Sequence, residues 1–441
     1  MLDIRLIRKA RQEVETKLKT KDPQIDLSNI CELDEQVRQH KTTVEALKAK
    51  RNEISQEIGV LKREGKNAST KMAEASTSAE QIHALDHEIK ELELRLQEAL
   101  SLLPNLPLDE IPISADPKDN VTIYEFGKKP AFSFPFKNHL ELNERLHLFD
   151  FKRGAKISGT GWPVYSHLGA RLEWALWQYM VDIHIKNGFI QWIPPLLVRK
   201  ETMFASGQLP KFEKQLFKIH DEDYFLYLIP TAEIPLNGLY MDEILEEEQF
   251  PLQYIAFTPC FRREAGAAGS QERGLIRMHQ FHKVEMFAFC LPEQSEAVFT
   301  KMLKSAEEIL EGLGIHYRHS LLVTGDMSFG AAKTVDVEVW LPGQGRYYEV
   351  SSVSYCSDYQ GRRSNTRVRR GKDRLEPVHT LNGSGLATSR LMVALLENNQ
   401  RADGSVEVPV VLKRYLGESF TLTPSAASCF GQSSSDEIKT F

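Results

Sequence analysis

The sequence predicts an α+β protein in which an antiparallel helical hairpin precedes a domain built on an antiparallel sheet with helices packed against it. Two observations lead to this prediction. Apolar residues recur in steps of three and four over residues 30–61 and again over residues 82–103, as they do in coiled coils. After a proline-rich segment, short apolar and β-branched runs alternate with helical stretches. With 441 residues, 41% of them hydrophobic, the chain is long enough for two or more domains.

The first helix of the expected hairpin carries a mostly apolar seam whose steps of three and four run without a break. The seam consists of Ile30, Leu33, Val37, His40, Val44, Leu47, Arg51, Ile54, Ile58 and Leu61, with only His40 and Arg51 interrupting it. After the turn "REGKNAS" the pattern resumes with Ile82, Leu85, Ile89, Leu92, Leu96, Ala99 and Leu103, and Pro104 ends it. We therefore expect an N-terminal domain over residues 1–110 with a coiled-coil arm at about 28–103.

The two expected helices of the arm differ in charge, although the whole chain has a net charge of only -6. The first helix and the turn carry Arg38, Lys41, Lys48, Lys50, Arg51, Lys62, Arg63 and Lys66. The second helix is acidic, with Glu74, Glu80, Asp86, Glu88, Glu91, Glu93 and Glu98. The basic first helix and turn can bind a polyanion such as RNA. Alternatively, these charges are the solvated flanks of a coiled coil that pair between the helices, and the arm alone leaves both interpretations open.

The cysteines and the apolar runs also indicate the cellular compartment of the protein. The five cysteines, Cys31, Cys260, Cys290, Cys356 and Cys429, form no C-x-x-C pair, so we expect neither a disulfide framework nor a structural zinc. No apolar run approaches the ~20 residues of a membrane span, and the N-terminus has no secretory apolar core. A cytoplasmic protein without a membrane partner is the resulting expectation.

The second domain is expected over residues 111–418, after the linker "LLPNLPLDEIPISADPKDN". Helices are predicted at Ala170–Lys186 and Glu296–Leu313. Strands are predicted for "YIAFTPCF", "KVEMFAFCL", "VDVEVWL" and "YYEVSSVS". Residues 419–441 are rich in serine and lack periodicity, which is typical of a disordered tail.

The stretch "RGLIRMHQFHKVEMF", residues 273–287, permits two interpretations. On a helix, His279, His282 and Glu285 fall near one face and resemble zinc ligands. On a strand, one face carries Arg277, His279, Phe281, Lys283 and Glu285, and the other carries Met278, Gln280, His282, Val284 and Met286. The strand is favoured, because the stretch follows an apolar run and a loop containing Gly266, Gly269 and Gly274.

The resulting hairpin gathers unusual polar chemistry on one sheet face. Arg262 and Glu264 come from its first strand, and Arg277, Phe281 and Glu285 from its second. A guanidinium binds phosphate or carboxylate oxygens, a phenyl ring stacks on a base, and a carboxylate accepts from an ammonium group. The face therefore suits ATP together with an amino acid. The chain has no G-x-x-x-x-G-K-[ST] loop of the kind that other ATP-binding proteins use.

These residues and three longer motifs resemble the class II aminoacyl-tRNA synthetases, and among them the seryl-tRNA synthetase family. "GFIQWIPPLLV" with Pro195 resembles motif 1, "FRREAGAAGSQERGLIRMHQFHKVE" resembles motif 2, and "LNGSGLATSRLMVALLEN" with Arg390 resembles motif 3. The order of these motifs, "TAEIPL" at residues 231–236 and the preceding arm make the resemblance specific over roughly residues 1–417. It implies a class II catalytic domain, with an antiparallel sheet flanked by helices.

The resemblance also implies roles for individual residues. Catalytic roles fall to Arg262 and Arg390. The serine-binding residues would be Thr231, Ala232, Glu233, Arg262, Glu285, Asn382 and Ser384. The ATP-binding residues would be Arg262, Arg263, Glu264, Arg277, Met278, Phe281, Glu349, Val350, Ser351, Ser352 and Arg390. Magnesium bound with ATP would contact Glu349 and Ser352, whose oxygens suit this hard cation.

The activity implied is that of an ATP-dependent serine:tRNA ligase. Its partners would be L-serine, ATP, the long variable arm of serine tRNA, held by the coiled coil, and a second copy of the chain in a homodimer. The family also suggests that selenocysteine tRNA is a substrate. Two other functions are compatible with parts of the sequence: a paralogue that loads a small amino acid onto a carrier protein, and a coiled-coil RNA-binding or scaffold protein with a degenerate catalytic domain.

Overall fold

The computed structural model describes residues 1–264, 274–372, 374–417 and 421–424. The chain forms two compact units, Met1–Leu106 and Pro107–Phe441. The glycine-rich part of the expected hairpin loop, residues 265–273, lies outside the described residues.

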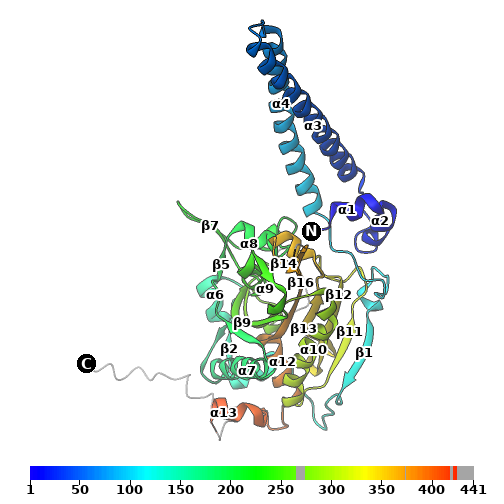
Figure 1. Ribbon diagram of the computed structural model, residues 1–441. Coiled ribbons are helices and arrows are strands. Elements are labelled where there is room, and N and C mark those ends of the chain that lie inside the picture. The colour runs from blue at the N-terminus through cyan, green and yellow to red at the C-terminus, as the bar shows by residue number, and fades with distance from the viewer. Residues whose placement is uncertain (265–273, 373, 418–420, 425–441) are drawn as a thin grey trace, which may run out of the picture. The chain divides into compact units, whose positions relative to one another are not determined.

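The first unit is helical and contains the expected hairpin (Figure 1). Two short helices, α1 (Ile4–Lys9) and α2 (Arg11–Lys19), precede the long helices α3 (Ser28–Arg63) and α4 (Ser69–Ser101). The 36 residues of α3 span about 54 Å at 1.5 Å per residue. Seam residues of both helices are buried against one another, among them Val44, Ile82 and Ile89.

The second arm helix begins earlier than the apolar repeat indicates. It starts at Ser69 and includes residues 69–81, where alanine and serine replace the large apolar side chains. Ser78 is buried on this stretch, so small residues continue the seam where leucine and isoleucine are missing. A repeat of large apolar residues begins only at Ile82, so that repeat does not predict the first part of the helix.

Part of the arm's charge is paired between its helices. Lys41 lies 2.7 Å from Glu93, and Lys71 on α4 lies 3.0 Å from Glu57 on α3. His40, which interrupts the seam, has its Nδ1 3.7 Å from Glu88. Lys50 and Lys62, in contrast, are exposed. The ion pairs between the helices support the interpretation of Lys41 and Lys71 as paired coiled-coil flanks. The exposed Lys50 and Lys62 remain compatible with binding to a polyanion.

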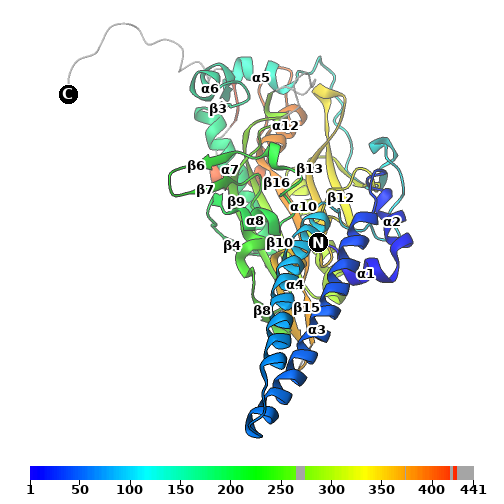
Figure 2. The same ribbon diagram turned by 90° about the horizontal axis from the view of Figure 1, so that it is seen from above.

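An eight-stranded sheet organises the second unit (Figure 2). In spatial order its strands are β1 (Val121–Phe126), β11 (Tyr317–Leu321), β12 (Lys333–Leu341), β13 (Arg346–Tyr355), β16 (His379–Ala387), β10 (Gln280–Cys290), β9 (Leu252–Phe261) and β4 (Ile190–Trp192). All neighbouring strands are antiparallel except the edge strand β4, which pairs with β9 in parallel. The four predicted strands and both predicted helices are confirmed.

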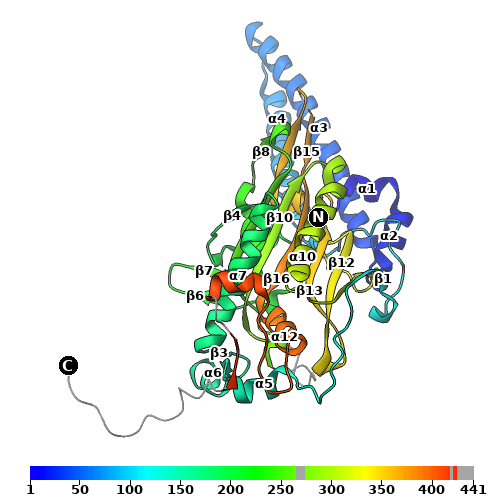
Figure 3. The same cartoon turned by 90° about the horizontal axis from the view of Figure 1, so that it is seen from below.

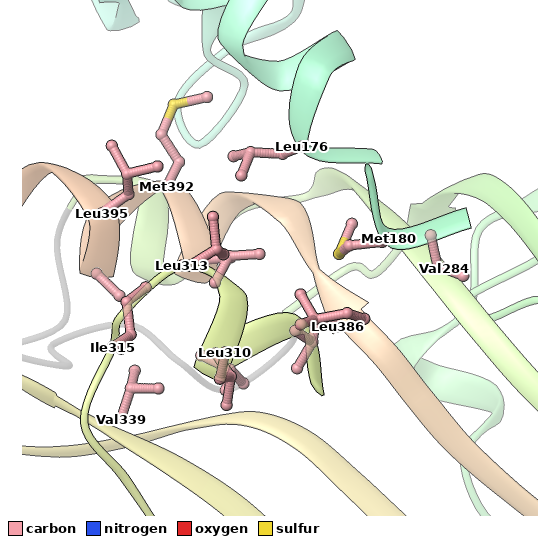
Figure 4. Packing of buried hydrophobic residues seen from close by; sticks show 14 of the residues in the cluster. Leu176, Met180, Val284, Leu310, Leu313, Ile315, Val339, Leu386, Met392 and Leu395 are labelled. Atoms are coloured by element: carbon pink, nitrogen blue, oxygen red, sulfur yellow. The ribbon is translucent and has the colours of Figure 1, made fainter. Parts of the chain in front are cut away.

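Three helices cover one face of this sheet: α7 (His167–Lys186), α10 (Ser295–Gly312) and α12 (Thr388–Asn398) (Figure 3). The main core lies between these helices and the sheet. Figure 4 shows Leu176 and Met180 of α7, Leu310 of α10 and Leu395 of α12 packed toward strand residues such as Val284. Burying each such side chain contributes about 1.5–3 kcal/mol, which fixes this face of the sheet toward the core.

Shorter elements complete the second unit. They are α5 (His139–Leu146), α6 (Phe151–Ser158), α8 (Lys200–Ala205), α9 (Glu233–Asn237), α11 (Tyr359–Ser364) and α13 (Lys413–Leu416), with the small strands β2 (Phe149–Asp150), β3 (Val164–Tyr165), β5 (Leu197–Val198), β6 (Lys218–His220), β7 (Phe225–Leu228), β8 (Ile244–Glu246), β14 (Arg367–Arg370) and β15 (Arg374–Pro377). Among them α5 packs against α12 and α13 against α7. Helices α9 and α11 contact the central strands β10 and β16 respectively.

The packed unit extends into the segment expected to be a disordered tail. Leu422 is buried and its backbone pairs with that of Val406. Residues 425–441 lie outside the described part of the chain. Among the described helices, none combines the length and the apolar character that a membrane crossing requires.

Candidate active site

Two adjoining cavities open on the face of the sheet opposite the core helices. The smaller has a volume of 180 Å³ and is lined by Arg262, Glu264, Ile276, Arg277, Met278, Phe281, Lys283, Glu349, Val350, Ser384, Ala387, Ser389 and Arg390. The larger measures 510 Å³ and reaches Thr231, Glu233, Glu285, Ser352, Asn382 and Ser384. Arg262, Glu264, Arg277 and Glu349 line both cavities, so the two form one continuous site.

The segments that follow β9 and precede β10 supply the cationic part of the site, and Phe281 of β10 supplies the aromatic part. The strand positions predicted for Arg262, Glu264 and Arg277 are wrong, because β9 ends at Phe261 and β10 begins at Gln280. The guanidinium of Arg262 lies 5.1 Å from the centre of the Phe281 ring. Arg277 forms an ion pair of 2.6 Å with Glu264, whose backbone has a φ of 48° in the left-handed region. Because non-glycine residues adopt this conformation infrequently, Glu264 marks a sharp departure of the chain from the strand.

Arg390 reaches the same cavity from the first turn of α12. Its Nη1 donates to the backbone oxygen of Glu349 at 2.7 Å, and it lies 3.5 Å from the Glu349 carboxylate. The residues that bring α12 to this position form a bulge in β16: between the pairs Lys283–Ala387 and Glu285–Ser384, β16 has one more residue than β10. The irregularity redirects the chain just before the helix.

The larger cavity contains a buried charged cluster on β10. Lys283 and Glu285 are ion-paired, and their side chains are only 8% and 2% exposed. The Thr231 hydroxyl accepts from Lys283 Nζ at 2.8 Å and donates to Glu285 Oε2 at 3.0 Å. Buried charges are costly without such partners, so Thr231 is required to satisfy both groups.

Glu233 is a second carboxyl group beside this cluster. Burial, together with the nearby charge of Glu285, raises the pKa of Glu233 to about 7. Lys283, Arg262 and the hydrogen bond from Gln360 oppose this shift. Gln360 donates to Glu233 Oε1 at 2.6 Å and Asn382 donates to the same oxygen at 3.3 Å. The site thus holds a carboxyl group that titrates near neutral pH.

Glu349 and Ser352 both line the larger cavity, although residues three apart on a regular strand point to opposite faces. A bulge explains this arrangement. Val337 pairs with Ser351 and Glu338 pairs with Glu349, which leaves Val350 as an extra residue. Asp336 lies opposite Ser352 on β12, and burial followed by the charge of Glu349 raises the pKa of its carboxyl well above the usual value.

The donor set of Glu349 and Ser352 fits a hard divalent cation. One carboxylate and one hydroxyl leave several positions for the phosphate oxygens and waters that magnesium prefers. No group of three histidine, cysteine, aspartate or glutamate side chains suited to a metal occurs within residues 1–264, 274–372, 374–417 and 421–424.

The zinc interpretation of residues 273–287 is wrong. Gln280–Cys290 is a strand, preceded by a short 3-10 turn at Gly274–Ile276. The three residues considered as ligands contact different groups: His279 lies 3.0 Å from the Arg262 oxygen, His282 lies 3.1 Å from Glu173, and Glu285 accepts from Thr231.

Three residues predicted for the site do not line either cavity. Ala232 is fully buried in a hydrophobic cluster with Phe287 and Phe289. Arg263 points elsewhere, and its Nη1 donates to the Lys214 oxygen at 3.3 Å. Ser351 is buried, and its hydroxyl donates to the backbone oxygen of Ser384. The bulge at Val350 explains the last case, because Ser351 and Ser352 face opposite ways.

Sequence reasoning also missed residues that the structure brings to the site. The alternation predicts Lys283 on the same face as Phe281 and Glu285, which is confirmed, but it gave this lysine no role. His279, predicted on that face as well, lines neither cavity. Gln360 and Phe329 line the larger cavity from segments remote in sequence. No local pattern marks these two residues, since only the fold brings them to the cavity.

Comparison with known proteins agrees with this geometry. Residues 1–107 match the model of the seryl-tRNA synthetase N-terminal domain, and residues 216–399 match the tRNA synthetase class II core domain (G, H, P, S and T). The chain is 53% identical over 424 residues to the serine–tRNA ligase of Chlamydia pneumoniae, covering 96% of this chain and 99% of that protein. The chain belongs to the seryl-tRNA synthetase family.

Solved structures of other seryl-tRNA synthetases share the fold. The enzyme from Pyrococcus horikoshii complexed with ATP matches with a TM-score of 0.91 and 37% identity, over 96% of this chain and all of that chain. The cytoplasmic serine–tRNA ligase of Naegleria fowleri in complex with AMP matches with a TM-score of 0.86 and 26% identity, over 96% and 99%. The predicted family and the predicted fold class are both confirmed.

Replacing Thr231 with valine tests its part in the buried charged cluster. Valine has nearly the same shape but leaves Lys283 and Glu285 each without one partner, which costs about 1–3 kcal/mol. We expect the melting temperature to fall by at least about 2 °C. Thr300→Val on the exposed surface of α10 is the matched control and changes stability by less than about 0.5 kcal/mol. Equal melting temperatures for the two variants would contradict the assigned role of Thr231.

Proposed function

We propose that this member of the seryl-tRNA synthetase family is a serine:tRNA ligase that forms seryl-adenylate from L-serine and ATP and then transfers the seryl group to the 3′ end of serine tRNA. The observation that carries the proposal is the continuous site. One half offers arginines and an aromatic ring, the other offers buried carboxyl groups, and Arg262 lines both. Such a site suits two reactants whose phosphate and carboxylate groups must meet.

ATP would occupy the smaller cavity. Phe281 offers a ring for adenine stacking, and Glu264 offers a carboxylate to the adenine amine. Arg277 and Arg390 would bind the terminal phosphates, and Arg262 would bind the α-phosphate together with the serine carboxylate. Pairing of Arg277 with Glu264 and of Arg390 with Glu349 holds both guanidiniums in the cavity before ATP binds. This preorganisation reduces the conformational cost of binding.

Serine would lie in the larger cavity. Glu233 and Glu285 would accept hydrogen bonds from its ammonium and hydroxyl groups, and Thr231, Asn382 and Ser384, which line the same cavity, would also contact it. A site that bonds a hydroxyl group discriminates strongly against alanine, because its polar groups lose their partner when the hydroxyl is absent. This supports serine as the amino acid.

Magnesium bound with ATP would be held by Glu349 and Ser352. When bound, it neutralises charge on the phosphate oxygens. The protein's own contribution to the first step is positioning and electrostatics: the serine carboxylate oxygen attacks the α-phosphorus, the bond to the bridging oxygen breaks, and pyrophosphate leaves. In the second step a terminal ribose hydroxyl of the tRNA attacks the seryl carbonyl and AMP leaves.

The arm and a second copy of the chain would complete the enzyme. Exposed lysines on α3, the first helix of the arm, would provide positive charge for the variable arm of serine tRNA. Selenocysteine tRNA is a further candidate substrate. The helix α7 and strand β4 expose Trp174, Ile190, Trp192 and Ile193, which are 60%, 59%, 39% and 87% exposed, and this apolar surface supports a homodimer through motif 1. We assign the enzyme to the cytoplasm, an assignment supported by free thiols at Cys31, Cys260 and Cys290.

Amino-acid-dependent exchange of pyrophosphate into ATP tests the first step. We expect exchange with serine, and at least about 100-fold less with alanine, because alanine leaves buried polar groups unpaired. The measurement uses the purified chain with radiolabelled pyrophosphate and each amino acid in turn. Absence of serine-dependent exchange would reject the proposal and favour a non-catalytic coiled-coil protein.

The raised pKa of Glu233 predicts how serine binding depends on pH. A carboxyl group with a pKa of about 7 is ionised above that pH, and the ionised fraction falls as the pH drops through 7. If the serine ammonium requires the carboxylate, the KM for serine rises roughly tenfold from pH 8 to pH 6. Gln360→Met removes a hydrogen bond that lowers this pKa, so it moves the rise to higher pH. A KM that stays constant over this range in both proteins would contradict the assignment.

Charge reversal on the arm separates its function from that of the catalytic unit. Lys50→Glu with Lys62→Glu is expected to lower kcat/KM for tRNA charging at least about tenfold through lost phosphate contacts. Pyrophosphate exchange, which needs no tRNA, stays unchanged. Glu80→Gln with Glu98→Gln on the acidic helix α4 is the matched control and leaves tRNA charging intact. Loss of exchange and charging together would argue against this division of labour.

A further inference from the structure

His279 is a motif 2 residue to which neither the cavities nor the family resemblance gives a role. It precedes β10 and lies outside both cavity linings, while Arg262, its neighbour across the hairpin, lines both. We propose that His279 is a positioning residue for seryl-adenylate formation, which holds the backbone of Arg262 so that its guanidinium meets the reacting phosphate and carboxylate. The inference rests on the proposed function of Arg262.

The hydrogen bonds around Arg262 give His279 this position. The Arg262 backbone N–H donates to the His279 carbonyl oxygen at 2.9 Å. His279 Nδ1 lies 3.0 Å from the Arg262 carbonyl oxygen, and since a carbonyl only accepts, Nδ1 carries the hydrogen. His279 thus provides a hydrogen-bond partner for both the backbone N–H and the carbonyl oxygen of Arg262.

The contact occurs where the regular strand ladder ends. The last pair between β9 and β10 is Phe261 with Gln280, so Arg262 is the first residue beyond it. Two residues later, Glu264 has left-handed backbone geometry. The imidazole N–H therefore extends the backbone pairing by one residue, to the position where a guanidinium must be aimed.

Other segments hold the His279 ring in place. Its backbone N–H donates to the Gly161 oxygen at 3.0 Å. The ring centre lies 5.4 Å from that of Trp162 and 6.4 Å from that of Phe217, which meets it edge to face. Gly161 has a φ of 84°, and a Cβ added there would lie 2.7 Å from His279 Cδ2. Only glycine leaves room for the ring at this distance.

This arrangement predicts different effects for two substitutions of His279. His279→Phe keeps an aromatic ring beside Trp162 and Phe217 but removes the donor. His279→Asn loses the ring but places an amide N–H close to the position of Nδ1. If the donor positions Arg262, the asparagine variant retains function and the phenylalanine variant does not.

The test measures kcat and KM for serine-dependent pyrophosphate exchange in the full chain. We expect His279→Phe to lower kcat roughly 10- to 100-fold, with KM for ATP changing less than about threefold, because a misplaced guanidinium weakens the transition state more than the ground state. His279→Asn should stay within about threefold of the unsubstituted protein, since the donor is kept. Gly161→Ala should resemble His279→Phe, because it displaces the ring without touching Arg262.

His316→Phe is the matched control. His316 Nδ1 also contacts a backbone oxygen, that of Phe126 at 2.6 Å, but it lies outside both cavity linings. We expect a lower melting temperature for this variant and an unchanged kcat. A loss of kcat equal to that of His279→Phe would show that such histidine contacts act only through general stability, and would overturn the inference.

Two further results would also overturn it: a His279→Phe variant with exchange within about twofold of the unsubstituted protein, or a His279→Asn variant as slow as His279→Phe. Deuterium uptake over residues 252–264 provides a readout that needs no activity, and it should rise in His279→Phe but not in His279→Asn. If the unsubstituted protein lacked serine-dependent exchange, the proposed function would fail, while the uptake comparison would still decide whether His279 holds Arg262.

Discussion

The antiparallel pairing of β9 with β10 in one register is the constraint on which the site depends. The register sets Phe261 opposite Gln280 and Ala256 opposite Glu285. With this pairing, Val284 and Met286 enter the core beneath α7 and α12, and Phe281, Lys283 and Glu285 face the cavities. A shift by one residue would exchange these two sets. The apolar core therefore selects the orientation of the polar site, although it contributes no atom to the chemistry.

The charged side chains of the polar face are paired before any ligand arrives. Lys283 and Glu285 form a buried pair, whereas Arg277 with Glu264 and Arg390 with Glu349 form partly exposed pairs. Removing charges from water costs several kcal/mol per ion unless the geometry compensates for it. A site that has already met this cost need not reorganise when ATP and an amino acid enter. Glu233 differs, since Gln360 and Asn382 give it neutral donors and leave its charge adjustable.

Much of this arrangement could be predicted from the sequence, because it follows from short-range periodicity. The heptads indicated the arm, and the alternation indicated that Phe281, Lys283 and Glu285 share the site face of β10. Arg277, Met278 and His279 precede the strand, so the alternation did not predict their positions. The start of α4 at Ser69 was missed because small residues form its seam. Ala232, Arg263 and Ser351 were placed in the site from motif membership, whereas packing and a bulge turn them away from it. Gln360 and Phe329 were beyond prediction, because only tertiary contacts between distant segments bring them to the larger cavity.

The bulge at Val350 has a consequence for how the gene can change. Most surface segments of an enzyme tolerate the loss or gain of one residue, since a loop absorbs the difference. In β13 one extra residue keeps Glu349 and Ser352 on the same side, with Val350 in the core between them. Inserting a single codon between Val337 and Glu338 of β12 would give Val350 a partner and restore a regular ladder, in which Glu349 and Ser352, three residues apart, point to opposite faces. The two proposed magnesium contacts would then separate although every side chain that does the chemistry is preserved. In this strand pair the number of residues is therefore under as strong a constraint as their identity.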